Sequence, residues 1–160
     1  MLHLVCLMET GPGPKSIAPS EPPPLPRRMW HRGVFVAAGI YNIGWGIYTG
    51  CDPQWLFRIA GMQPDNHPQI FACLGMVVGL YGILYFEIAR APERGWLLAF
   101  VGLGGKVLGP IGLLALIWKG TWPPATLVIC LTNDFIWWLP FLLYLRDSWP
   151  HFRSSLRANC

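Results

Sequence analysis

Two charged residues lie in the middle of apolar stretches: Lys106 near the centre of residues 96–118, and Asp134 near the centre of residues 125–145. Each lies about ten residues from the start of its stretch, so roughly 15 Å along a helix and halfway through a ~30 Å hydrocarbon core. If the two stretches form a hairpin around Gly120, both charges lie at the same depth. An intramembrane charge costs about 2.5 kcal/mol or more, so the two residues indicate either a locked ion pair or a functional site.

Two amides extend this polar centre. Asn42 lies near mid-depth of the stretch 33–50, and Asn133 directly precedes Asp134. One interpretation is a buried salt bridge with amide support that fixes how the helices pack. A second is a ligand or proton site, because a lysine beside an aspartate could bind a carboxylate or a quinone headgroup. A third is an enzyme centre, but a nucleophilic lysine must be uncharged, which the neighbouring aspartate opposes. The sequence identifies no catalytic residue.

Composition places these residues in a membrane protein. The 160-residue chain is 53% hydrophobic and only 12% charged, about half the charged fraction of a typical soluble domain. We therefore expect an all-α polytopic membrane protein with four transmembrane helices in an antiparallel bundle. The expected spans are 33–50, 69–89, 96–118 and 125–145, within a transmembrane domain of 29–149. Residues 1–28 form a Pro-rich disordered or extended tail, and residues 150–160 a second tail.

The loop between the first two spans predicts a short interfacial helix. Asp52 is the expected N-cap, Pro53 the first helical residue and Gly61 the stop. Trp55 and Phe57 between them are expected to face lipid.

The basic residues predict the orientation. Apart from Lys106 inside the third span, all but two fall on one side of the four-span arrangement, the exceptions being Arg58 and Lys119. This bias predicts a protein of the cell inner (plasma) membrane with both termini in the cytoplasm. At the cytoplasmic interface, we expect Glu87 to form an ion pair with Arg90 or Arg94.

The third span carries four glycines along one face: Gly102, Gly105, Gly109 and Gly112. Such a face lets a neighbouring helix approach closely, so we expect it to pack inside the bundle. Pro110 lacks the N–H that would bond the carbonyl of Lys106, and that carbonyl then needs another partner or a water-lined cavity.

The cysteines and histidines show no CxxC motif and no spacing typical of metal ligands, so we expect no metal and no cofactor. Cys51 and Cys73 fall at similar depth, which leaves open a disulfide, a thiol site or chance placement. The basic residues are dispersed, so no nucleic-acid partner is expected.

The stretches GIYNIGWGIYTGCDPQWLFRIAG, ARAPERG, GKVLGPIG and LTNDFIWWLPF lie within a layout that resembles the small four-helix bacterial membrane proteins of the DoxX-like group. The resemblance covers about residues 33 to 145. It implies a four-helix bundle in the inner membrane and no established reaction, so it transfers no catalytic residue.

Three functions remain open. The first is a non-catalytic bundle or accessory subunit of a membrane complex, with the lipid bilayer and a membrane-protein partner or a second copy as partners. The second is a small transporter or a lipid- or quinone-binding protein, and the third is a membrane enzyme acting on a lipid-soluble substrate. A sealed Lys106–Asp134 pair favours the first function, whereas an accessible cavity at that pair favours the other two.

Overall fold

The structure, a computed structural model, describes residues 23–158, and this part of the chain is helical without strands. Most of the predicted tail, residues 1–22, lies outside the described residues. Three segments are long and apolar enough to cross a membrane, which confirms the expected class of membrane protein. They are α3 (Pro68–Arg90), α4 (Trp96–Trp118) and the continuous helical segment Pro124–Arg157.

The last segment contains four elements in succession. A 3-10 turn, η1 (Pro124–Thr126), leads into α5 (Leu127–Cys130), then a π-helical turn, η2 (Leu131–Phe135), and finally α6 (Ile136–Ala158). The helix therefore continues beyond the expected end of the fourth span, and residues 150–158 of the second tail are helical.

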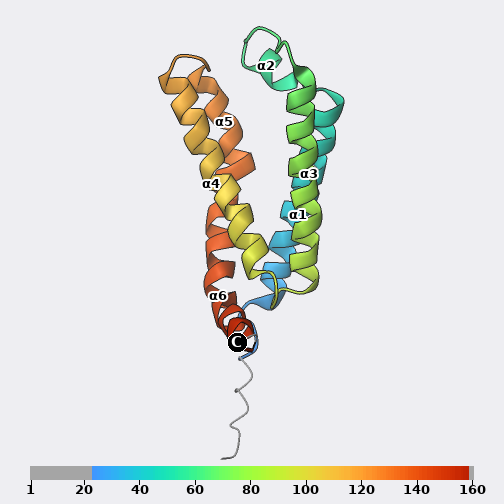
Figure 1. Cartoon of the computed structure of the whole chain (residues 1–160), viewed down its shortest axis with the longest axis vertical. Helices are drawn as coiled ribbons and strands as arrows, with labels where there is room; N and C mark the ends of the chain where they lie inside the picture. Colours follow the sequence, from blue (N-terminus) through green and yellow to red (C-terminus); the bar gives the residue numbers. More distant parts are fainter. Residues whose placement is uncertain (1–22, 159–160) are drawn as a thin grey trace, which may run out of the picture.

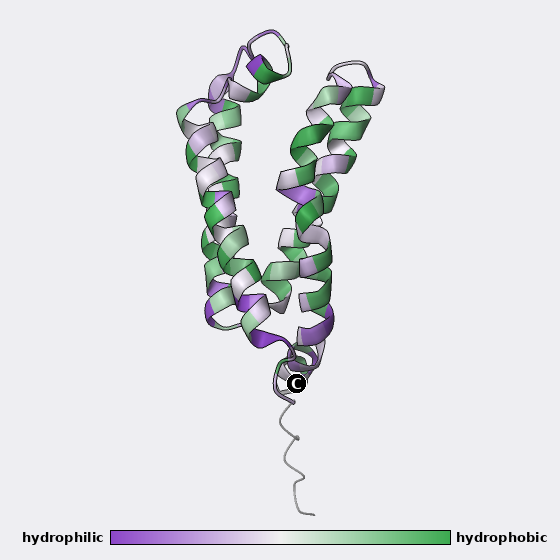
Figure 2. Ribbon diagram, turned by 180° about the vertical axis from the view of Figure 1, so that it is seen from behind, coloured by the Kyte–Doolittle hydropathy of each residue, from purple (hydrophilic) through white to green (hydrophobic). Residues whose placement is uncertain are grey.

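The helices form two arms (Figure 1). The first arm pairs α1 (Arg28–Cys51) with α3, and the second pairs α4 with the segment 124–158. The arms meet where α1 begins and α6 ends, which we call the closed end, and diverge toward α2 (Trp55–Ile59), which we call the open end. Figure 2 shows mostly apolar residues along both arms and hydrophilic residues gathered at the closed end.

The first arm is held together by glycines that let two backbones touch. A Cβ added at Gly46 would lie 2.6 Å from the carbonyl oxygen of Gly75, and one at Gly82 would lie 2.7 Å from that of Gly39. No side chain fits at these positions, so the α1–α3 contact depends on the absence of side chains.

The arms join at the closed end through an aromatic core. Phe35, Tyr85, Phe141 and Tyr144 are at most 1% exposed, and their rings lie in edge or tilted contacts with centroids 4.7 to 6.0 Å apart. Such contacts add to the apolar burial of each ring. The core therefore fixes the arms at one end only.

Two local predictions were wrong. Helix α2 begins at Trp55 rather than at Pro53, because the Asp52 carboxylate pairs with the Arg58 guanidinium instead of capping the helix. Trp55 is 9% exposed and donates its indole N–H to the Thr49 hydroxyl at 3.1 Å, so its ring packs against α1 and does not face lipid. Gly61 ends the segment with a φ of 65°, as predicted.

Candidate functional site

The four predicted polar residues line one cavity between the two arms. Asn42 comes from α1, Lys106 from α4, and Asn133 and Asp134 from the π-helical turn η2. The cavity has a volume of about 220 Å³. Its remaining walls are apolar or aromatic side chains of α3 and two glycines of α4: Leu74, Val77, Val78, Tyr81, Tyr85, Gly102 and Gly105.

Lys106 is buried at this cavity with few partners. The residue is 5% exposed, and its ammonium donates a hydrogen bond of 2.6 Å to the carbonyl of Asn133. The Trp137 ring lies 5.8 Å from the same nitrogen, within reach of a cation–π interaction. An ammonium has three N–H donors, so two of them have no hydrogen-bond acceptor among the described residues.

Asp134 is also 5% exposed, but it does not contact Lys106 directly. Within residues 23–158, the ion pairs with N···O distances up to 4.0 Å do not include these two. The Asp134 carboxylate accepts a hydrogen bond of 2.9 Å from the Asn133 side-chain amide. Asn133 therefore contacts both charges. Of the predicted direct or water-bridged pair, the direct form is absent, and the two charges lie on the wall of one cavity.

Two amide oxygens at the site are buried without a partner among the described residues: Asn42 Oδ1 and Asn133 Oδ1. Asn42 as a whole is 3% exposed. A buried acceptor without a hydrogen bond costs about 1–3 kcal/mol, so each of these two oxygens needs a donor, which a water molecule or a ligand group in the cavity can supply.

The π-helical turn and Pro110 each free a backbone carbonyl for a hydrogen bond between α4 and the segment 124–158. The Pro110 ring leaves the Lys106 carbonyl free, and that carbonyl accepts a hydrogen bond of 3.1 Å from the Trp138 indole. The turn η2 in turn offers the Asn133 carbonyl to Lys106. Single π-helical turns within helices are frequent at functional sites. The predicted partner for the freed carbonyl exists, and it is an indole.

The prediction that the glycine face of α4 packs inside the bundle was largely wrong. At Gly102, an added Cβ would lie 2.6 Å from the Tyr85 hydroxyl, so this position is tightly packed. At Gly105 and Gly112 an added Cβ would meet nothing within 4 Å. Gly105 therefore lines the cavity and is not part of a helix contact.

The predicted ion pair of Glu87 with Arg90 or Arg94 forms with Arg90, at an N···O distance of 2.6 Å. Arg94 is in no ion pair among the described residues, whereas Glu93 pairs with Arg28 at 2.6 Å. Burial acts to raise the pKa of the Glu93 carboxyl, but the hydrogen bond and charge of Arg28 hold that pKa below its ordinary value.

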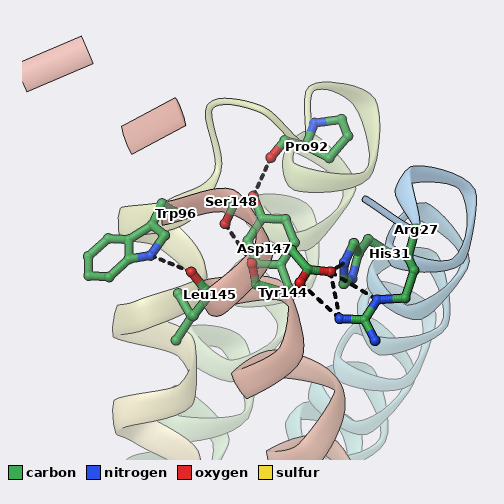
Figure 3. Close-up of polar contacts among 8 residues, drawn as sticks. All are labelled: Arg27, His31, Pro92, Trp96, Tyr144, Leu145, Asp147 and Ser148. Atoms are coloured by element: carbon green, nitrogen blue, oxygen red, sulfur yellow. Dashed lines mark hydrogen bonds and ion pairs between the residues drawn. The ribbon is translucent and has the colours of Figure 1, made fainter. Parts of the chain in front are cut away.

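A polar clamp at the closed end was not predicted (Figure 3). Asp147 of α6 accepts hydrogen bonds of 2.8 Å from the Arg27 guanidinium and from His31 Nε2 of α1. The Tyr144 hydroxyl donates to the Pro92 carbonyl at 2.6 Å, and the Trp96 indole donates to the Leu145 carbonyl at 2.9 Å. These bonds tie α6 to α1 and to the start of α4.

The charged and imidazole members of the clamp, Arg27, His31 and Asp147, lie outside the apolar stretches 33–50, 69–89, 96–118 and 125–145. Arg27 and Asp147 are 120 residues apart, so no local pattern relates them. The sequence feature that could have indicated the clamp is Asp147, a carboxylate just beyond the fourth expected span.

Cys51, Cys73 and Cys130 are all free, so the open alternative of a Cys51–Cys73 disulfide is not what the structure contains. Among residues 23–158, no three His, Cys, Asp or Glu side chains come together as a metal site would require.

Comparison of the chain with protein-family models, with curated proteins and with solved structures finds no match. The resemblance to the DoxX-like group therefore stays a prediction. The evidence on function comes from the geometry of the cavity.

Proposed function

We propose that the protein is a four-span antiparallel membrane protein of the inner membrane, with α1 as the additional span. Helix α1 has 24 residues, about 36 Å at 1.5 Å per residue, which is enough to cross a hydrocarbon core. It touches α3 at Gly46 near one end and at Gly39 near the middle. A helix in backbone contact with a spanning helix at two heights lies at the same depth in the bilayer.

The charge distribution supports an orientation with the closed end in the cytoplasm. In the described residues, eight arginines lie just before or in the first turns of α1, at or just after the end of α3, or from the middle of α6 onward, all toward the closed end: Arg27, Arg28, Arg32, Arg90, Arg94, Arg146, Arg153 and Arg157. Arg58 and Lys119 are the basic residues of the open end.

Cysteine labelling tests this orientation. Cys51 is exposed beside the open end, so an impermeant maleimide should label it on intact cells in a variant whose other cysteines are replaced by serine, and Cys51→Ser in that background should remove the label. Ser155→Cys, in α6 beyond the closed end, should react only after the cells are permeabilised. The reverse pattern would invert the orientation, and labelling of both sites from outside would contradict four spans.

Within this framework, we propose that the protein binds the polar end of a small lipid-soluble molecule in the cavity, as a binding protein or transporter. One observation carries the proposal: Lys106 and Asp134 are buried without pairing directly, and both line a cavity that also holds two unpartnered amide oxygens. A purely structural polar centre is expected to satisfy its own groups. Binding pockets typically have apolar walls and a few polar groups that converge on the ligand, and this cavity has both.

A cavity-filling substitution tests the binding proposal. Gly105→Leu places a side chain in the cavity without a backbone clash, because an added Cβ meets nothing within 4 Å. Gly104→Leu is the matched control, since Gly104 is equally free of close neighbours and does not line the cavity. Both variants should fold alike.

Native mass spectrometry of the protein extracted in mild detergent gives the readout. We expect a small-molecule adduct on the wild type and on Gly104→Leu, and its loss from Gly105→Leu. An adduct that survives in Gly105→Leu, or a wild type without one, would contradict binding in this cavity.

A further inference from the structure

We propose that the ligand of the cavity carries a free hydroxyl group, so that its class is the hydroxylated amphiphiles: long-chain alcohols, phenols and related lipids. This inference depends on the proposed binding function and adds the chemical class of the ligand. It follows from which hydrogen-bonding groups of the cavity have partners and which do not.

The cavity has acceptors that need donors. Asn133 Oδ1 has no partner, and its orientation is fixed, because Nδ2 of the same amide donates to the Asp134 carboxylate at 2.9 Å, which can only accept. Asn42 Oδ1, on the α1 side of the cavity, is also buried and unpartnered. An ionised Asp134 carboxylate has two oxygens, so it keeps acceptor capacity beyond its hydrogen bond from Asn133. A ligand that satisfies these oxygens must offer O–H or N–H donors.

The cavity also has donors that need acceptors. Lys106 uses one N–H on the Asn133 carbonyl and has two more. An oxygen that accepts from Lys106 while donating its own hydrogen to an amide oxygen satisfies both sides of the site. A hydroxyl is the simplest group with this property.

Charge complementarity disfavours ionic ligands. An anion would be attracted by Lys106 but would lie against the Asp134 carboxylate and two amide oxygens. A cation would be attracted by Asp134 but repelled by Lys106 in the same low-dielectric space. A neutral headgroup incurs neither repulsion.

The size of the cavity and its apolar wall indicate an amphiphile. A volume of about 220 Å³ is below the usual range for whole drug-sized ligands and suits a headgroup. Leu74 and Val77, on the α3 side of the same cavity, are 49% and 50% exposed. They provide an apolar surface along which the chain of the ligand can lie.

Three probes of similar size distinguish a hydroxyl, an ether and an anionic ligand: 4-hexylphenol, its methyl ether 4-hexylanisole, and the anion 4-hexylbenzoate. Binding is measured by isothermal titration on the full chain in mild detergent, with Gly105→Leu subtracted to remove partition into the micelle. We expect the phenol to bind at least about tenfold more tightly than the ether, because the ether leaves a buried acceptor unpaired. Asn42→Leu, of similar volume, should reduce this preference severalfold.

The outcomes separate the two proposals. If phenol and ether bind equally well and Gly105→Leu abolishes both, the cavity binds ligands but the hydroxyl class is wrong. If the benzoate binds most tightly, the class is an anion. If no probe distinguishes the wild type from Gly105→Leu, the proposed binding function fails as well. Should Asn42→Leu not fold, as judged by its thermal midpoint, the ranking of the three probes on the wild type decides the class.

Discussion

The contact between α1 and α3 predicts a measurable difference between two alanine substitutions in one helix. In Gly46→Ala, the new Cβ would lie 2.6 Å from the Gly75 carbonyl oxygen and 2.8 Å from the Gly79 Cα, both of them backbone atoms. Ordinary contacts of a Cβ begin at 3.4 Å, so the helices must separate by about 0.8 Å, and overpacking of this kind costs about 1–3 kcal/mol.

Gly44→Ala is the matched control, because its Cβ meets nothing within 4 Å. Both variants gain the same helix propensity of about 1 kcal/mol on replacing glycine, so this gain cancels in the comparison. The free energies of unfolding should therefore differ by about 1–3 kcal/mol, with Gly46→Ala the less stable. At about 3 °C per kcal/mol for a chain of this size, the thermal midpoints should differ by about 3–9 °C.

Thermal unfolding in mild detergent, followed by tryptophan fluorescence, measures the difference. Gly82→Ala repeats the test at the second contact, where the added Cβ would lie 2.7 Å from the Gly39 carbonyl. Midpoints of Gly46→Ala and Gly82→Ala equal to that of Gly44→Ala would refute the close approach of α1 and α3.

Two further predictions concern the charges. Lys106 and Asp134 each contact Asn133 rather than one another, so a double-mutant cycle with Lys106→Met and Asp134→Asn should give a coupling free energy of about 1 kcal/mol or less. A coupling free energy of about 3 kcal/mol or more, measured by unfolding in detergent, would show that Lys106 and Asp134 form a direct ion pair. The lowered pKa of Glu93 means that its pair with Arg28 stabilises the fold above the ordinary carboxyl value of 4.5 and is lost as the pH falls through the lowered value. Glu93→Gln should thus be less stable than the wild type at pH 7, by no more than about 1 kcal/mol since both groups are partly exposed, and the difference should be smaller at about pH 4, below the ordinary carboxyl value. Thermal midpoints at the two pH values measure it, and a difference that persists in acid would assign the effect to packing.

The sequence predicted the long helices of this protein and grouped its buried polar residues. Helix α4 has the predicted bounds of 96–118, and α3 begins at Pro68, one residue before the predicted span. Helix length follows from the length of an apolar stretch and from local signals such as proline and glycine, and these are legible along the chain. For the same reason, Asn42, Lys106, Asn133 and Asp134 could be grouped before any fold was known.

Only the tertiary structure decided how those residues meet. Equal depth on neighbouring helices predicted a direct or water-bridged pair of Lys106 and Asp134. The rotation of each helix and the divergence of the arms placed a cavity at the two charges instead of a direct contact. The same divergence left Gly105 open while Gly102 is packed. The Arg27–Asp147 clamp joins residues 120 positions apart, and partners so distant in sequence are chosen by the packing of whole helices. Periodicity fixes which residues share a face of one helix, whereas the angle between helices decides which faces touch.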